Sequence, residues 1–345
     1  MFRVIINQFQ NIISPDKKKF NFFKISFGCK ALQKYFWVDI IIKERKKRIT
    51  MNNGLVAGIK IYTEPSMKDR IELSSGVMPV NILNNIECKT PVYVPVKPWR
   101  KPNKHELEFL IAQKNDMNDY QLAGIITIPS FLKKAFEKIK ISDCTTHAEI
   151  NRLTATATFK KIVDDTVNYY EQWAAEKNAA IPHNIYLGEP NLPNNTYNRK
   201  DNYFIGLHLD SFEQKPGAER AVARNRICIN LGKEPRYLLF YNIGYINMAK
   251  MTGFKDEFLQ KSHNMYEVLY HFFDRYKNYP VIKIKINPYE AYIAPTENII
   301  HDGCTDGCTQ KDINLAIRGY YHIPIVEKSY FRNLKNFYSK ILKSN

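Results

Sequence analysis

The chain has 345 residues, 44% of them hydrophobic, and a formal net charge of +17. This length can bury one sizeable core with or without a smaller appendage, and the absence of an apolar run of about 18 residues argues against a membrane-spanning helix. The cysteines are scattered except for the last two, and we see no secretion signal, so we expect free thiols in a reducing cytoplasm. They are Cys29, Cys88, Cys144, Cys228, Cys304 and Cys308.

The first 50 residues carry more than half of the excess positive charge. They contribute +9 and the remaining residues +8. Phenylalanines and Trp37 lie among the lysines without a clear period, and Met51-Asn-Asn-Gly then reads like a new start. We treat 1–50 as a separate basic segment. A misassigned start codon, a genuine basic appendage and a targeting peptide all remain open for it.

Residues 51–180 are predicted to form helices and a strand that pack on the core of the protein. Asn103-x-x-Glu106 has the form of a capping box, and apolar residues recur at helical spacing in the two later helices. The predicted elements are a short helix after Asn103, a strand at 122–128, a helix opened by Pro129 and a helix at 156–177. We expect the aromatic side chains of these helices to belong to the hydrophobic core.

After residue 180 the pattern changes to short strands separated by turns. The predicted strands are 203–209, 226–231, 237–243, 281–286, 290–294, 299–302 and 314–322. A helical insertion near 255–277 interrupts them, and 329–342 forms a basic amphipathic helix. This succession predicts an α+β protein with a catalytic core at 181–345. The core is expected to be a double-stranded β-helix, that is, a cupin-like jelly-roll, with flanking helices.

His208, Asp210 and His301 are the candidate metal ligands. His208 and Asp210 lie two residues apart in a strand pattern, so their side chains share one face while Leu207 and Leu209 point into the core. His301 ends a strand, a proline turn and a second strand, and facing strands of a double sheet would bring it opposite the pair. Two imidazoles and one carboxylate suit a non-haem Fe(II) site with open positions.

Arg318 follows His301 by 17 residues and lies on a later strand. A guanidinium there could form a two-pronged pair with the distal carboxylate of a dicarboxylate co-substrate. The combination of His-x-Asp, a distant His and then an Arg resembles the Fe(II)/2-oxoglutarate-dependent oxygenase superfamily. The Ala-Pro-Thr-Glu-Asn-x-x-His turn is most similar to its phytanoyl-dioxygenase-like and small-molecule hydroxylase branches. The resemblance covers roughly residues 180–325.

The resemblance implies that His208, Asp210 and His301 ligate iron and that Arg318 binds the C5 carboxylate of 2-oxoglutarate. It also implies that O2 is used to attack an unactivated C–H bond of a small molecule, such as an amino acid or a natural-product intermediate. Many members have Ser or Thr two residues after the arginine. This chain has Tyr320, whose hydroxyl we expect to help hold the co-substrate. Halogenases of the superfamily replace the acid by a small residue, so Asp210 favours hydroxylation or desaturation.

Several alternatives compete with this interpretation. Cys304-x-x-x-Cys308 follows His301 and could form a zinc site with it, although a fourth ligand is missing. The simpler interpretation is a loop that carries two free thiols and solvated aspartates. A nucleic-acid-binding protein fits the charge, but its excess is mostly terminal and no nucleic-acid motif occurs. A non-catalytic cupin-like binding protein is the third alternative. One of the arginines after the metal strand could reach substrate or co-substrate, but for each singly a solvated sheet edge is the favoured interpretation. The aspartates after His301 are predicted to be solvated. The arginines are Arg224, Arg226 and Arg236, and the aspartates are Asp302, Asp306 and Asp312.

Overall fold

The computed structural model describes residues 54–63, 65–113, 122–198 and 200–323. All of them belong to one compact unit, 51–345. The basic segment 1–50 and the expected C-terminal helix 329–342 lie outside the described residues, so the expectations about both stay predictions.

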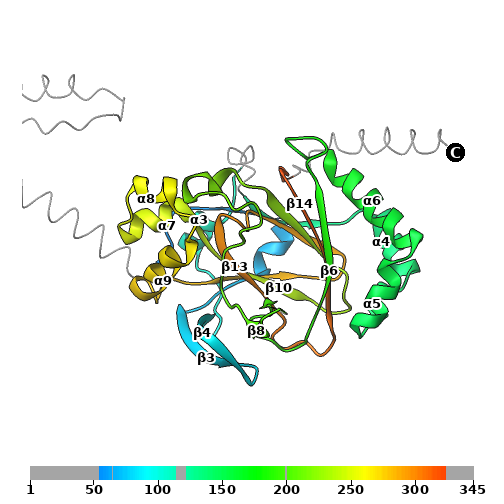
Figure 1. Ribbon diagram of the computed structural model, residues 1–345, viewed down its shortest axis with the longest axis horizontal. Coiled ribbons are helices and arrows are strands. Elements are labelled where there is room, and N and C mark those ends of the chain that lie inside the picture. Colours follow the sequence, from blue (N-terminus) through cyan, green and yellow to red (C-terminus); the bar gives the residue numbers. More distant parts are fainter. Residues whose placement is uncertain (1–53, 64, 114–121, 199, 324–345) are drawn as a thin grey trace, which may run out of the picture. The chain divides into compact units, whose positions relative to one another are not determined.

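Two sheets form the centre of the described chain (Figure 1). The larger has the order β1 (Ile61–Tyr62), β5 (Ala123–Thr127), β12 (Glu290–Ala294), β9 (Asn225–Asn230), β14 (Asp312–Gly319), β6 (Ile181–Gly188). The smaller has the order β13 (Ile299–Cys304), β10 (Arg236–Gly244), β11 (Ile282–Ile286), β2 (Ile71–Leu73). Every pair is antiparallel except β1 with β5. The predicted α+β class with antiparallel sheets is confirmed.

The inner strands β12, β9 and β14 of the larger sheet are buried on both faces. In β9, Ile227 and Ile229 belong to the hydrophobic cluster that includes the helices α4 to α6, whereas Cys228 belongs to the cluster shared with the smaller sheet. This division follows from the period of two along a strand. The same alternation directs the Arg226 side chain to the face of β9 that carries Cys228, toward the smaller sheet.

Helices cover the sheets in two groups (Figure 1). The first is α4 (Ser130–Lys138), α5 (His147–Thr154) and α6 (Ala157–Glu171); the second, between β10 and β11, is α7 (Tyr245–Thr252), α8 (Asp256–Lys261) and α9 (Met265–Arg275). The predicted helix at 156–177 therefore ends earlier, and α5 was not predicted. The single helix predicted near 255–277 is two, because the Asn264 side chain caps a new helix by accepting from the Tyr266 N–H.

The remaining elements are short. They are the hairpins β3 (Val77–Leu83) with β4 (Ile86–Pro95) and β7 (Tyr197–Asn198) with β8 (Tyr203–Phe204), and the 3-10 turns Pro65–Arg70, Ile141–Asp143 and Gly217–Val222. The two hairpins share a small hydrophobic cluster of their own that includes Val92 and Phe204. Among the described helices, none is long and apolar enough to cross a bilayer. The five cysteines of the described residues are unpaired thiols.

The predicted capping box is present at α3 (Lys104–Leu110). The Asn103 side chain accepts from the Glu106 N–H at 2.9 Å, and the Glu106 carboxylate accepts from the Asn103 N–H at 2.8 Å. Arg100 donates to both carboxylate oxygens, at 2.7 and 2.5 Å. The hydrogen bonds from Arg100 lower the pKa of Glu106 in spite of its burial. Glu106 thus stabilises both the helix start and the preceding segment.

We expect Glu106→Gln to lower the free energy of unfolding by about 0.5–1 kcal/mol at pH 7, because glutamine keeps the cap but loses the ion pair. Since the pKa of Glu106 is lowered on folding, this contribution is complete above its unfolded pKa of about 4.3 and is lost as the pH falls through the folded value. Urea unfolding from pH 7 toward pH 3.5 should show the gap between wild type and variant closing. Asn103→Ala, which removes the cap, is the control expected to keep its cost at both pH values; a gap for Glu106→Gln that persists at acid pH would contradict the argument.

Candidate metal centre and its cavity

His208 and His301 are direct neighbours in one antiparallel bridge. The His208 N–H donates to the His301 carbonyl at 3.0 Å, and the His301 N–H donates back at 2.8 Å. The expectation that they would face each other from opposite sheets is therefore wrong: His208 extends the smaller sheet beside β13. Side chains of directly paired residues project from the same face of a sheet, so the bridge brings the two imidazoles together.

The predicted triad converges. The Nε2 atom of His208 lies 3.8 Å from Oδ1 of Asp210, and the Nε2 atom of His301 lies 3.6 Å from Oδ2. One ligand atom from each residue can be chosen so that all lie within 4.8 Å of one another, and all three residues are buried. Leu207 and Leu209 are buried in the main hydrophobic core, as the period-two pattern predicted. The three polar groups therefore share one small volume.

Backbone carbonyls orient both imidazoles. The Nδ1 atom of His208 lies 2.8 Å from the Gly206 carbonyl, and that of His301 lies 3.2 Å from the Ile299 carbonyl. A carbonyl can only accept, so each Nδ1 carries the proton and each Nε2 keeps its lone pair for the centre of the triad. Burial lowers the pKa of His301 to about 3. At neutral pH this imidazole is in the uncharged form that binds metals.

Asp210 is held as a carboxylate. Burial opposes its ionisation, but the Arg226 guanidinium and the two imidazoles outweigh burial and lower the pKa of Asp210 to about 2. Nη2 of Arg226 lies 2.6 Å from Oδ2 of Asp210. The same Oδ2 is a buried oxygen that accepts no well-directed hydrogen bond. An ionised carboxylate whose two oxygens lie near two free imidazole nitrogens is a donor set that fits a divalent cation.

Arg220 connects the two segments that carry the ligands. It is 1% exposed, and its Nη1 donates to the carbonyls of Asp210, at 2.8 Å, and Glu297, at 3.1 Å. Its Nη2 donates to the Ser211 hydroxyl at 3.2 Å. One guanidinium thus ties the backbone of the His-x-Asp segment to the turn before β13. The sequence contains no motif that marks this residue, because its partners are mainly backbone carbonyls.

The triad opens into a cavity of about 1240 Å³. The wall near the triad includes Arg226, Cys228, Arg236 and Tyr292, and the cavity continues past β6 to α5 and α6. The side chains of Arg226 and Arg236 are only 12% and 6% exposed. The prediction that they lie at a solvated sheet edge is therefore wrong, because the strand alternation turns them inward.

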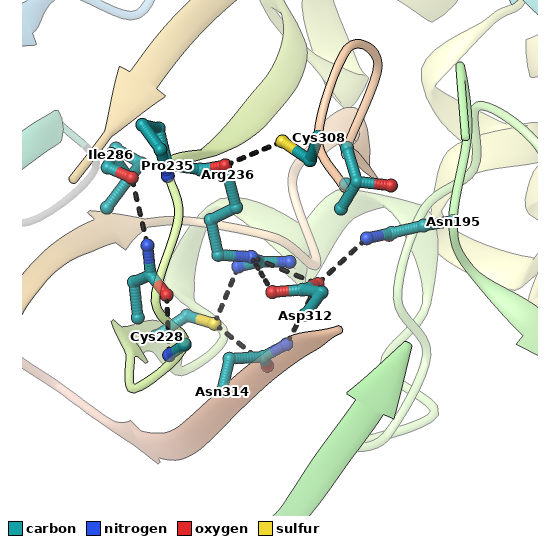
Figure 2. A network of polar contacts seen from close by, with 12 residues as sticks. Asn195, Cys228, Pro235, Arg236, Ile286, Cys308, Asp312 and Asn314 are labelled. Carbon is teal, nitrogen blue, oxygen red and sulfur yellow. Dashed lines mark hydrogen bonds and ion pairs between the residues drawn. The ribbon is translucent and has the colours of Figure 1, made fainter. Parts of the chain in front are cut away.

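Arg236 is fixed by a buried polar network (Figure 2). Its Nε lies 3.0 Å from Oδ1 of Asp312, whose Oδ2 accepts from the amides of Asn195, at 2.9 Å, and Asn314, at 3.3 Å. Burial disfavours the charged guanidinium, but Asp312 more than offsets this and raises the pKa of Arg236. Nη1 contacts Sγ of Cys228 at 3.1 Å. The hydrogen bond from Arg236 to Asp312 therefore comes from Nε, while Nη1 donates to Cys228.

Arg318 contacts this wall, and neither Arg318 nor Tyr320 is part of its lining. Arg318 is directly opposite Arg226 in the β14–β9 register, and its guanidinium carbon lies 4.3 Å from the centre of the Phe212 ring. The Tyr320 ring lies 5.0 Å from the guanidinium carbon of Arg224. Among the described residues that line the cavity, Phe212 is present and neither Arg318 nor Tyr320 is. The structure thus brings the three predicted ligands together, and it places Arg318 behind Phe212, a residue of the cavity wall, with Tyr320 against Arg224.

The loop after β13 differs from the prediction. Asp302 and Asp312 are buried and not solvated. Neighbouring amides and a hydroxyl donate hydrogen bonds to their carboxylates in place of water. The Cys308 thiol donates to the Pro235 carbonyl at 3.0 Å (Figure 2). Within the described ranges, the triad is the one cluster of His, Cys, Asp and Glu suited to a metal ion. The geometry therefore gives no support to a zinc site built on Cys304 and Cys308.

We expect Arg220→Lys to weaken Co(II) binding by roughly 10- to 100-fold, the usual cost of losing a group that orients a metal ligand. One ammonium cannot reproduce the fork that bridges the Asp210 and Glu297 carbonyls. Co(II) titrations followed by visible absorption measure the affinity, and thermal unfolding records the loss of stability separately. Arg70→Lys, which perturbs the partly buried Arg70–Glu290 ion pair, is the control; equal Co(II) affinities in both variants would contradict the clamp.

Comparison with known proteins gives distant matches. No protein-family model matches the chain, and no curated protein matches it significantly. Among solved structures, the Kdo hydroxylase KdoO, described as a non-heme Fe(II) alphaketoglutarate dependent dioxygenase in complex with alphaketoglutarate and Fe(III), is 12% identical with a TM-score of 0.36. Its apo structure is 13% identical with a TM-score of 0.36. Both matches cover 59% of this chain and 82% of that chain. Because these TM-scores are low, the function has to be inferred from the residues of this chain.

Proposed function

We propose that the protein is an Fe(II)- and 2-oxoglutarate-dependent dioxygenase that hydroxylates a C–H bond of a small molecule. The observation that carries the proposal is the convergence of His208, Asp210 and His301 in a form ready for a metal ion. Both Nε2 atoms keep their lone pairs, and Asp210 is ionised. Two imidazoles and one carboxylate on one side of an ion leave its other positions open, which is the arrangement of non-haem Fe(II) oxygenases.

The order of the strands supports a double-stranded β-helix for the core. Along the chain, β6, the His208 segment, β9 and β10 alternate between the larger and the smaller sheet; β11 stays in the smaller sheet, and β12, β13 and β14 alternate again. These eight segments form two four-stranded layers, β12-β9-β14-β6 and His208-β13-β10-β11. Two packed layers linked in this way are a jelly-roll. The triad then lies where the second segment of the core meets β13.

The residues around the triad would hold the iron and tune its surroundings. Iron bound there would supply the oxidation of a C–H bond by O2, with 2-oxoglutarate as the co-substrate. Arg226 keeps Asp210 ionised and orients its carboxylate. The Gly206 and Ile299 carbonyls fix the imidazole tautomers. Asp210 at this position, in place of a small residue, favours hydroxylation or desaturation over halogenation.

The distal carboxylate of 2-oxoglutarate has two candidate partners. The family resemblance points to Arg318, but Arg236 lines the same cavity as the triad and Arg318 does not. We propose Arg236 for this role, because its hydrogen bond to Asp312 comes from Nε and its Nη1 donates to a weak acceptor, the Cys228 Sγ. A carboxylate could take the place of that sulfur in a two-pronged pair with the terminal nitrogens. Asn314 and Tyr292 also line this part of the cavity. The cavity of about 1240 Å³ exceeds the range of roughly 300–1,000 Å³ for one small ligand, which leaves room for a substrate beside the co-substrate.

Removal of a ligand should abolish turnover and change the metal site. We expect Asp210→Asn and His301→Gln each to reduce substrate-independent 2-oxoglutarate decarboxylation at least about 100-fold, since each removes an Fe(II) ligand. Anaerobic addition of Fe(II) and 2-oxoglutarate should give wild type a weak visible absorption band that both variants lack. A wild-type protein without this band would remove the basis of the proposal. Zn(II) is not readily oxidised and gives no such visible band. A preference for Zn(II) over Fe(II) in competition titrations would therefore favour hydrolytic chemistry instead.

The two arginine assignments predict different losses. If Arg236 holds the distal carboxylate, Arg236→Lys should raise the Kd for 2-oxoglutarate by roughly 10- to 100-fold, because a point charge replaces a fork. The double variant Arg236→Gln with Asp312→Asn removes both buried charges, so no carboxylate is left unpaired. It should show the same loss if it folds. Titration with Mn(II) present measures the Kd; a loss confined to Arg318→Gln would assign the co-substrate to Arg318.

A further inference from the structure

We propose that Arg318, beside Phe212, is a binding subsite for an anionic group of the substrate, such as a carboxylate, sulfonate or phosphate. The inference rests on the proposed function and names the substrate class of the same site. It assigns Arg318 to the substrate and leaves the co-substrate to Arg236.

Two guanidiniums lie side by side near the candidate metal centre. Arg318 on β14 is the direct cross-strand partner of Arg226 on β9. Their guanidinium carbons lie 4.3 Å and 5.2 Å, respectively, from the centre of the same Phe212 ring. Like charges directly opposite each other in a sheet are destabilising. The pair therefore lowers the stability of the folded protein, and a bound anion would offset this loss.

Only one of the two has a carboxylate. Arg226 pairs with Asp210 at 2.6 Å, whereas Arg318 has no ion pair within the part of the chain that the structure describes. The Nε atoms of both arginines are buried without a hydrogen-bond acceptor. The neighbouring arginines are different, because Arg224 pairs with Glu213 at 3.0 Å and Arg236 with Asp312 at 3.0 Å. Unlike Arg224, Arg226 and Arg236, Arg318 therefore has no carboxylate partner among the described residues.

Binding of iron and co-substrate would not remove the excess positive charge of this pair. The two positive charges of Fe(II) and the two negative charges of 2-oxoglutarate cancel, and Asp210 still balances only one of Arg226 and Arg318. One positive charge remains next to the centre, at Arg318. An ion pair in a partly buried site is screened less by salt than one on the surface. A substrate anion would restore neutrality in the region where the metal ligands lie.

Phe212 places the subsite at the cavity. It lies two residues after Asp210 and lines the cavity, and it is 42% exposed. Its ring both lies against the Arg318 guanidinium and lines the cavity. A substrate whose anionic group reaches Arg318 at the edge of Phe212 would therefore have its remaining atoms near the triad. Guanidinium binds planar carboxylates and tetrahedral oxyanions by the same fork. The geometry therefore specifies a negatively charged group on the substrate and does not distinguish a carboxylate from a sulfonate or a phosphate.

The test uses the full chain loaded with Mn(II) and saturating 2-oxoglutarate, with methanesulfonate as the probe. Paramagnetic Mn(II) should broaden the methyl proton signal of methanesulfonate bound nearby, and acetate and inorganic phosphate should compete for the site. We expect Arg318→Gln to weaken methanesulfonate binding at least about tenfold, as for the loss of one charge-assisted contact. The Kd for 2-oxoglutarate should change less than about threefold, and Arg318→Lys should restore part of the binding.

Arg224→Gln is the matched control. Arg224 also lies against an aromatic ring but is paired with Glu213, so its replacement should leave methanesulfonate binding unchanged. Broadening that survives in Arg318→Gln, or a loss of 2-oxoglutarate affinity as large as that of methanesulfonate, would overturn the subsite. If wild type binds 2-oxoglutarate but not methanesulfonate, the subsite alone fails. If it binds no 2-oxoglutarate in the presence of metal, the proposed function fails and the subsite with it.

Discussion

The candidate site depends on the antiparallel bridge between His208 and His301. Two backbone hydrogen bonds, 3.0 and 2.8 Å long, join these residues and set their side chains on one face. The period of two then adds Asp210 to the same group, while Leu207 and Leu209 are buried in the core. Residues far apart in the chain thus form one site because their backbones pair. Any change that separates the two segments separates the ligands.

Buried charge is concentrated around this bridge. Arg226 pairs with Asp210 and Arg236 with Asp312, and all four side chains are 12% exposed or less. A buried ion pair costs desolvation that its attraction only partly returns, so apolar residues of similar size would stabilise the fold at least as well. The pairs are better explained by what they position: Arg226 keeps the candidate metal ligand Asp210 ionised, and Asp312 holds Arg236 at the cavity. Arg220 contributes differently, since it neutralises no ligand and fixes two backbone segments.

The sequence predicted the type of most elements and the three residues of the triad, because helical spacing, strand alternation and the His-x-Asp pattern are local signals. It did not predict the bridge, since pairing between distant segments has no local signal. Arg226 was misplaced for a related reason. The alternation with Ile227 and Ile229 was visible, but either face of β9 could have been the one toward the helices. Arg236 precedes the apolar run of β10, as a residue at a sheet edge would. Its burial depends on the ion pair with Asp312, a distant residue that no local pattern identifies.

The two ends of β14 separate the roles of Arg236 and Arg318. Asn314 and Arg318 are four residues apart in a strand, a distance of about 13 Å at about 3.3 Å per residue. Arg236 belongs with the Asn314 end, through Asp312, and Arg318 with the end that carries Arg226 and Asp210. A co-substrate that chelates a metal at the triad and extends to Arg236 runs toward the Asn314 end, away from Arg318. The same direction leaves Arg318 to a second anion, which is why the identity of the substrate is best sought among molecules that carry one.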